Sequence, residues 1–202
     1  MYQNSWFMRI GTLGFHLLLL NMLFWVGLLI GIGIFGLFPS IVALFAALKQ
    51  IVINKDDQKL PRIFWQNYKK EFLSANLLGF IYSVSFSSLY FYYRILHTLP
   101  SSVWVQLGSG VLIFVLFVIL LSLSAVFPLF VHYKYRTWQY PKFALIYAVS
   151  RPLHTLALVL ILLIFIIVYL RFLSLFLLIG VSSMALVIMW IGSSHLLSDQ
   201  RL

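Results

Sequence analysis

Residues 103–131, VWVQLGSGVLIFVLFVILLSLSAVFPLFV, contain no Asp, Glu, Lys or Arg. A hydrocarbon core about 30 Å thick needs a helix of about 20 predominantly apolar residues, so this stretch is long enough to cross a membrane. The whole chain is 63% hydrophobic and 9% charged, whereas soluble domains carry about 25% charged residues. Because the apolar runs are continuous and not alternating, they predict helices and not barrel strands. The predicted fold is all-α: one polytopic helical membrane domain with five or six membrane segments.

The apolar runs and the polar stretches between them divide residues 1–202 into spans and connections. The predicted spans lie at about 10–35, 39–53, 73–93, 103–131, 153–170 and 172–196, and the long connections lie at 54–72 and 132–152. Pro39 suits the first turn of a helix, where its missing N–H costs nothing, and Pro128 stands in a similar Phe-Pro pair. We expect both prolines to mark structural turns. The 39–53 helix is short for a membrane span. Three arrangements therefore stay open: it crosses the membrane at a tilt, forms a re-entrant segment or lies at the membrane interface.

The basic residues predict an orientation. Two of them, Arg94 and Arg171, fall on one side, and ten lie in or beside the long connections: Lys49, Lys55, Lys59, Arg62, Lys69, Lys70, Lys134, Arg136, Lys142 and Arg151. Cytoplasmic loops carry an excess of Lys and Arg, so we expect both long connections and the C-terminus in the cytoplasm. If 39–53 crosses, there are six spans and the N-terminus is inside; otherwise there are five and it is outside. We favour six.

A basic amphipathic helix is predicted at 60–72, because Leu60, Phe64, Tyr68 and Phe72 recur at every fourth position and share one helical face. Such a helix lies along an anionic membrane surface or against a partner. The second long connection holds another interfacial segment. The candidate partner- or lipid-contact residues are Arg62, Trp65, Lys69, Lys70, Lys134, Arg136, Lys142 and Arg151.

The four acidic residues, Asp56, Asp57, Glu71 and Asp199, all lie in polar connections or in the C-terminal tail. No acid therefore stands at membrane depth to orient a catalytic histidine or to bind a coupling ion. The five histidines lack HxxH or HExxH spacing and the chain has no Cys, which argues against a metal site. We expect a non-enzyme with no catalytic residue, cofactor or metal. The net charge of +10 reflects the cytoplasmic loops, not nucleic-acid binding.

Polar residues inside predicted spans are the remaining candidates for a specific role. His16 and Asn21 lie on the first span and Asn76 begins another. The expected role of these candidate helix-packing residues is hydrogen bonding between helices, worth about 1 kcal/mol.

Two segments of the sequence resemble each other. GLFPS at 36–40 resembles AVFPL at 125–129, and each is followed by a basic connection with a second proline before a basic residue, Pro61-Arg62 and Pro141-Lys142. This pattern predicts a two-fold repeat of 10–93 and 103–196 in the same orientation.

Four blocks of sequence resemble the YesL-like family of bacterial integral membrane proteins, found mostly in Gram-positive bacteria. They are LNMLFWVGLLIGIGIFGLFPSIVALFAALKQIV (20–52), KLPRIFWQNYKKEFLSANLLGFI (59–81), SAVFPLFVHYKYRTW (124–138) and AVSRPLHTLAL (148–158). The resemblance implies a multi-pass plasma-membrane protein, often encoded beside carbohydrate ABC importers and glycan-degrading enzymes, with no known catalytic residues. The family usually has an acid near Arg136, where this chain is wholly basic.

These features favour an accessory membrane subunit of a carbohydrate ABC importer. Its expected partners are the lipid bilayer, the permease subunits and a solute-binding protein. Two alternatives stay open: a homo-oligomeric channel or facilitator, and a membrane sensor or regulator of sugar uptake.

Overall fold

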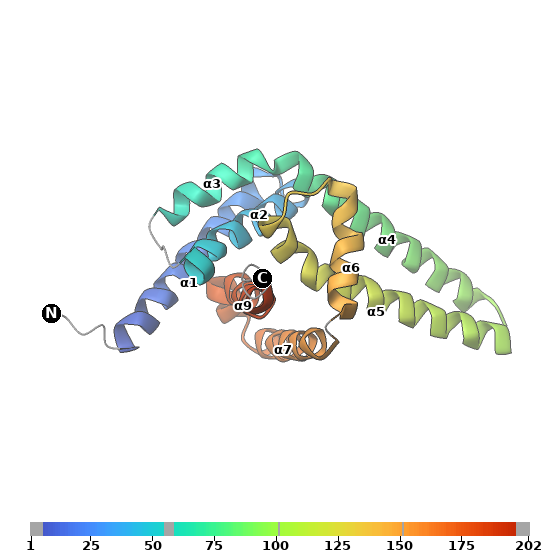
Figure 1. The fold of residues 1–202 in the computed structure, drawn as a ribbon. Helices are drawn as coiled ribbons and strands as arrows, with labels where there is room; N and C mark the ends of the chain where they lie inside the picture. The colour runs from blue at the N-terminus through green and yellow to red at the C-terminus, as the bar shows by residue number, and fades with distance from the viewer. Residues whose placement is uncertain (1–5, 55–58, 101, 151, 197–202) are drawn as a thin grey trace.

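The computed structural model describes residues 6–54, 59–100, 102–150 and 152–196. Within these ranges every regular element is a helix (Figure 1). Five stretches are long and apolar enough to cross a membrane, namely Ile10–Ile30, Ile34–Asn54, Phe72–Thr98, Val103–His132 and Leu173–Gly192. The prediction of an all-α, polytopic membrane protein is therefore confirmed.

The helices follow one another with short connections. In chain order they are α1 (Trp6–Ile30), α2 (Ile34–Lys49), the π-helical turn η1 (Gln50–Asn54), α3 (Leu60–Lys70), α4 (Phe72–Thr98), α5 (Val103–His132), the 3-10 turn η2 (Thr137–Gln139), α6 (Tyr140–Ser150), α7 (Pro152–Arg171), α8 (Leu173–Leu175), the π-helical turn η3 (Phe176–Gly180) and α9 (Val181–Leu196). Thr137–Ser150 and Thr155–Arg171 are bent by 103° relative to each other, so they form at most one broken span.

The chain reverses direction between α1 and α2 at Gly31, Ile32 and Gly33, earlier than the sequence predicts. Gly33 has φ +74°, a left-handed conformation that glycine adopts readily. A Cβ on Gly31 would collide with the backbone of Gly36, so the two helix ends can approach only because both residues are glycine. The first helix therefore ends at Ile30, and α2 with η1 gains a full 21 residues.

Pro39 and Pro128 both lie inside helices, α2 and α5 respectively. The prediction that they mark turns is wrong. The turn before α2 is made by the Gly31–Gly33 segment, so Pro39 is already the sixth residue of the helix. Pro128 packs against Gly192 of α9. The two residues are so close that a Cβ added to Gly192 would lie 3.4 Å from the proline ring.

Helix α2 lies at the centre of the bundle and contacts α1, α3, α4, α5 and α9. Its residues from Val42 to Leu48 are all buried, as expected for a helix that is apolar all round. Phe45 stacks on Phe127 of α5, with ring centroids 5.6 Å apart. Figure 1 shows α4 and α5 running side by side away from this bundle.

The two halves of the chain share local features that agree with the predicted repeat. Helices α3 and α6 each have 11 residues with proline in second place. Each buries every fourth residue: Leu60, Phe64 and Tyr68 in α3, and Tyr140, Ala144 and Ala148 in α6. The two-fold repeat of 10–93 and 103–196 stays a prediction.

Candidate functional site

A cleft of about 330 Å³ opens where α4 begins and α5 ends. We call it the basic cleft. Its lining residues come from both halves of the chain: Val42, Ala46, Asn67, Lys70, Glu71, Ser74, Phe130, Val131, Lys134, Tyr135, Thr137 and Tyr140.

One wall is formed by the end of α3 and the start of α4. The apolar face of α3 packs on α1 and α2, and the Tyr68 hydroxyl donates a hydrogen bond to the Gly27 carbonyl oxygen at 2.9 Å. Burial raises the pKa of Tyr68, whose hydroxyl is protonated at neutral pH even at the ordinary pKa of about 10. The apolar stripe predicted for a membrane surface or a partner is thus covered by the chain itself, and the polar face of α3 is left exposed.

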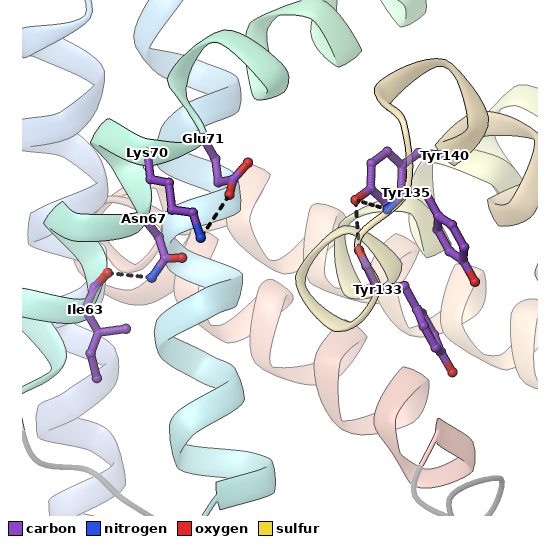
Figure 2. Close-up of polar contacts among 7 residues, drawn as sticks. All are labelled: Ile63, Asn67, Lys70, Glu71, Tyr133, Tyr135 and Tyr140. Carbon is purple, nitrogen blue, oxygen red and sulfur yellow. Dashed lines mark hydrogen bonds and ion pairs between the residues drawn. The ribbon is translucent and has the colours of Figure 1, made fainter.

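The junction between α3 and α4 places Lys70 and Glu71 at the cleft (Figure 2). The Glu71 N–H donates to the Asn67 carbonyl oxygen at 2.9 Å, and the Asn67 side-chain amide donates to the Ile63 carbonyl oxygen at 2.8 Å. Lys70 Nζ lies 3.8 Å from Glu71 Oε1 in an ion pair whose lysine is 64% exposed. Exposed pairs of this kind contribute little free energy, so the Lys70 ammonium is free to change partners.

The opposite wall is the segment after α5, which Tyr140 holds in place (Figure 2). The buried Tyr140 hydroxyl donates to the Tyr133 carbonyl oxygen at 2.8 Å and accepts from the Tyr135 N–H at 3.1 Å. The Tyr135 ring stacks on Phe143 with centroids 4.5 Å apart. These contacts fix the backbone on both sides of Lys134. The sequence does not predict this role of Tyr140, because nothing in the local pattern indicates where a tyrosine hydroxyl bonds.

The charges of the cleft favour an anion. The cleft is lined by two lysines, Lys70 and Lys134, and one acid, Glu71, so its formal charge is +1. Lys49 adds to the positive field nearby, since its ammonium donates to the carbonyl oxygen of the lining residue Val131 at 3.1 Å. Hydroxyl and amide donors on Ser74, Thr137 and Asn67 complete a site suited to oxyanions.

The structure brings only two of the predicted contact residues, Lys70 and Lys134, into this cleft. Arg62, Lys69, Arg136 and Lys142 are exposed elsewhere on the surface, and Trp65 is half-buried against the core. Arg151 lies outside the described residues.

Asn21 forms a second polar site, inside the bundle. Its fully buried side chain donates to the Leu177 carbonyl oxygen at 2.7 Å and accepts from the Ser182 N–H at 3.2 Å. Trp25 Nε1 donates to the same Leu177 oxygen at 3.1 Å. These bonds join α1 to Leu177 in the π-helical turn η3 and to Ser182 just after it.

The other two candidate helix-packing residues differ from Asn21. Asn76 uses its side-chain amide within its own helix, donating to the Phe72 carbonyl oxygen at 2.9 Å. The half-buried His16 ring lies beside Phe15, with centroids 6.1 Å apart. Among the described residues, no three His, Asp or Glu side chains are grouped to hold a metal ion.

Comparisons with known proteins give the following matches. The model of a family described as "Protein of unknown function, DUF624" matches residues 17–93. In Bacillus subtilis, the uncharacterized protein YteU is 31% identical over 136 residues, covering 67% of this chain and 60% of YteU. The uncharacterized protein YesV is 30% identical over 140 residues, covering 67% and 65% of the two chains. The uncharacterized protein YesL is 28% identical over 152 residues, covering 75% and 68%.

The matches to YteU and YesV thus span less than two thirds of the length of those relatives. No solved structure matches the chain.

Proposed function

The chain belongs to the YesL-like DUF624 family, and from that premise we propose that it is a non-enzymatic membrane subunit accompanying a carbohydrate ABC importer. It packs against the permease subunits or stabilises their assembly. We place it in the bacterial plasma membrane with its C-terminus in the cytoplasm. The choice of an importer follows from the resemblance to YesL-like proteins, and the mode of action from the arrangement of the helices.

The observation that carries the proposal is the projecting pair of helices, the α4–α5 arm, which we define as residues 83–100 and 102–121. The arm begins beyond the hydrogen bond between the Tyr82 and Ser122 hydroxyls, at 2.7 Å, and extends away from the other helices (Figure 1). Large apolar side chains along it are exposed, among them Phe91 at 66%, Trp104 at 81% and Phe114 at 67%. A helix pair with so much uncovered surface is suited to packing against helices of another protein.

Polar groups on the arm favour protein over lipid as its neighbour. Ser83, Ser87 and Gln106 are exposed on the same helices, and polar side chains in a bilayer pair preferentially with other helices. Gly110 has open space around its Cα, and small residues of this kind let two helices approach closely.

The exposed face of α3 supplies a second contact. Arg62 and Lys69 point away from the bundle core, because the apolar residues of α3 occupy its other face. A basic surface of this kind steers and orients an acidic partner. On the permease we therefore expect acidic residues at the level of α3.

Co-purification tests the proposal. The tagged protein is co-expressed with the importer genes and purified in mild detergent, and we expect the permease subunits to accompany it. Gly110→Leu adds bulk to the arm and should abolish co-purification. Gly11→Leu is the matched control on α1, since a Cβ at either glycine meets no atom within 4 Å.

Recovery of the wild-type protein without any permease contradicts the proposal. Equal loss of permease in both glycine variants contradicts the assignment of the permease contact to the α4–α5 arm. A homo-oligomer that conducts solute in liposomes supports the channel alternative instead.

A further inference from the structure

We propose that the basic cleft binds the phosphate group of an anionic phospholipid headgroup. This inference is independent of the proposed function, because it uses neither the α4–α5 arm nor any importer subunit.

The position of the cleft in the fold suits a lipid headgroup. Two candidate spans, Phe72–Thr98 and Val103–His132, pack against each other as an antiparallel hairpin (Figure 1). The cleft lies where the first begins and the second ends, between Lys70–Ser74 on one side and Phe130–Lys134 on the other. When this hairpin crosses a bilayer, its paired ends reach the headgroup region, and the cleft opens at that level.

The charges of the cleft match a phosphodiester. The two ammonium groups of Lys70 and Lys134 and the carboxylate of Glu71 sum to +1, which one phosphodiester of charge −1 neutralises. Lys70 is held only by an exposed ion pair with Glu71, at 3.8 Å, and it can turn to a phosphate without breaking a buried contact. Basic pockets beside membrane helices are known sites for anionic lipid headgroups.

The lining of the cleft changes from polar to apolar, as a lipid does between its headgroup and its chains. Asn67, Ser74 and Thr137 provide neutral hydrogen-bond donors beside the lysines. Val42, Ala46 and Phe130 provide an apolar wall from α2 and α5. The volume of about 330 Å³ is at the lower end for small-ligand pockets, enough for a headgroup but not for a whole lipid.

Thermal unfolding of the full-length protein in non-ionic detergent tests the site. The unfolding midpoint is followed while phosphatidylglycerol, phosphatidylcholine or inorganic phosphate is added, since a ligand of the folded state raises the midpoint. We expect a saturable rise with phosphatidylglycerol and none with phosphatidylcholine or inorganic phosphate at the same concentration.

Two charge variants separate the cleft from the general surface charge. Lys70→Gln with Lys134→Gln should raise the phosphatidylglycerol concentration needed for half the rise by about tenfold or more. Arg62→Gln with Lys69→Gln removes the same charge from the exposed residues of α3 and should leave the titration unchanged. Ser74→Phe keeps every charge but narrows the cleft, and it should also weaken binding.

Identical titrations for the two charge variants would overturn the proposal, because surface charge alone would then explain the effect. An equal rise with inorganic phosphate would overturn the assignment to a lipid and indicate a free anion. The absence of any rise with phosphatidylglycerol would overturn the site itself.

Discussion

Asn21 lies fully buried in α1, and its side-chain amide serves two backbone groups that are about 160 residues away in sequence. The Leu177 carbonyl oxygen belongs to the π-helical turn η3, and the Ser182 N–H follows just after it. Without the amide, the Ser182 N–H loses this acceptor in an apolar interior, and the Leu177 oxygen keeps only the bond from Trp25 Nε1. Loss of a hydrogen-bond partner in such an interior is costly. Asn21 therefore couples the first helix of the chain to the last.

At this residue we predict that Asn21→Leu lowers the free energy of unfolding by about 1–2 kcal/mol. The control is Asn76→Leu, which removes only a bond within α4 and should cost less than half as much. Unfolding in mixed micelles measures both changes. An Asn21→Leu protein as stable as the wild type would contradict the role of the amide.

At the scale of elements, α3 and α6 each bond to a long helix through a tyrosine hydroxyl that donates to a glycine carbonyl oxygen. Tyr68 donates to Gly27 of α1 at 2.9 Å, and Tyr147 donates to Gly192 of α9 at 3.1 Å. Each bond therefore joins a different short helix to a different long one.

We predict that Tyr68→Phe and Tyr147→Phe loosen these two helices separately. Loss of such a hydrogen bond costs about 1 kcal/mol, so amide hydrogen exchange in the affected helix should speed up about fivefold. Tyr68→Phe should act on α3 and spare α6, and Tyr147→Phe should do the reverse. Equal acceleration in both helices would show that the tyrosines stabilise the bundle as a whole.

Some features of these helices are predictable from the sequence and others are not. The stripe Leu60, Phe64 and Tyr68 is a local pattern, and it correctly predicted a helix with one apolar face. What covers that face was not predictable, because the answer depends on α1 and α2. The meeting of Lys70 and Lys134 and the partner of Asn21 are also tertiary contacts between distant segments. Pro39 was expected in the first turn of its helix. The prediction was wrong because the glycine turn at 31–33 starts α2 earlier, at Ile34.

At the scale of the whole molecule, the hairpin of α4 and α5 has the basic cleft at one end and the turn between the two helices at the other. Gln139 lies beside the basic cleft residues Thr137 and Tyr140, whereas Leu99, 51% exposed, lies at the far turn. The excess of basic residues predicts that the cleft end faces the cytoplasm.

Since the chain has no Cys, single cysteines report this orientation without background. We predict that Leu99→Cys reacts with a membrane-impermeant maleimide in intact cells, and that Gln139→Cys reacts only after permeabilisation. The reverse pattern would place the basic cleft outside the cell.

The proposal that permease helices cover the α4–α5 arm is tested most directly by site-specific photo-crosslinking in cells that express the importer. A photoreactive phenylalanine analogue replaces Phe114 on the arm, 67% exposed, or Phe15 on α1, 63% exposed, as the matched control. We predict that Phe114 crosslinks to a permease subunit more strongly than Phe15 does. Crosslinks from Phe114 only to lipid, or to a second copy of this chain, would contradict the proposal.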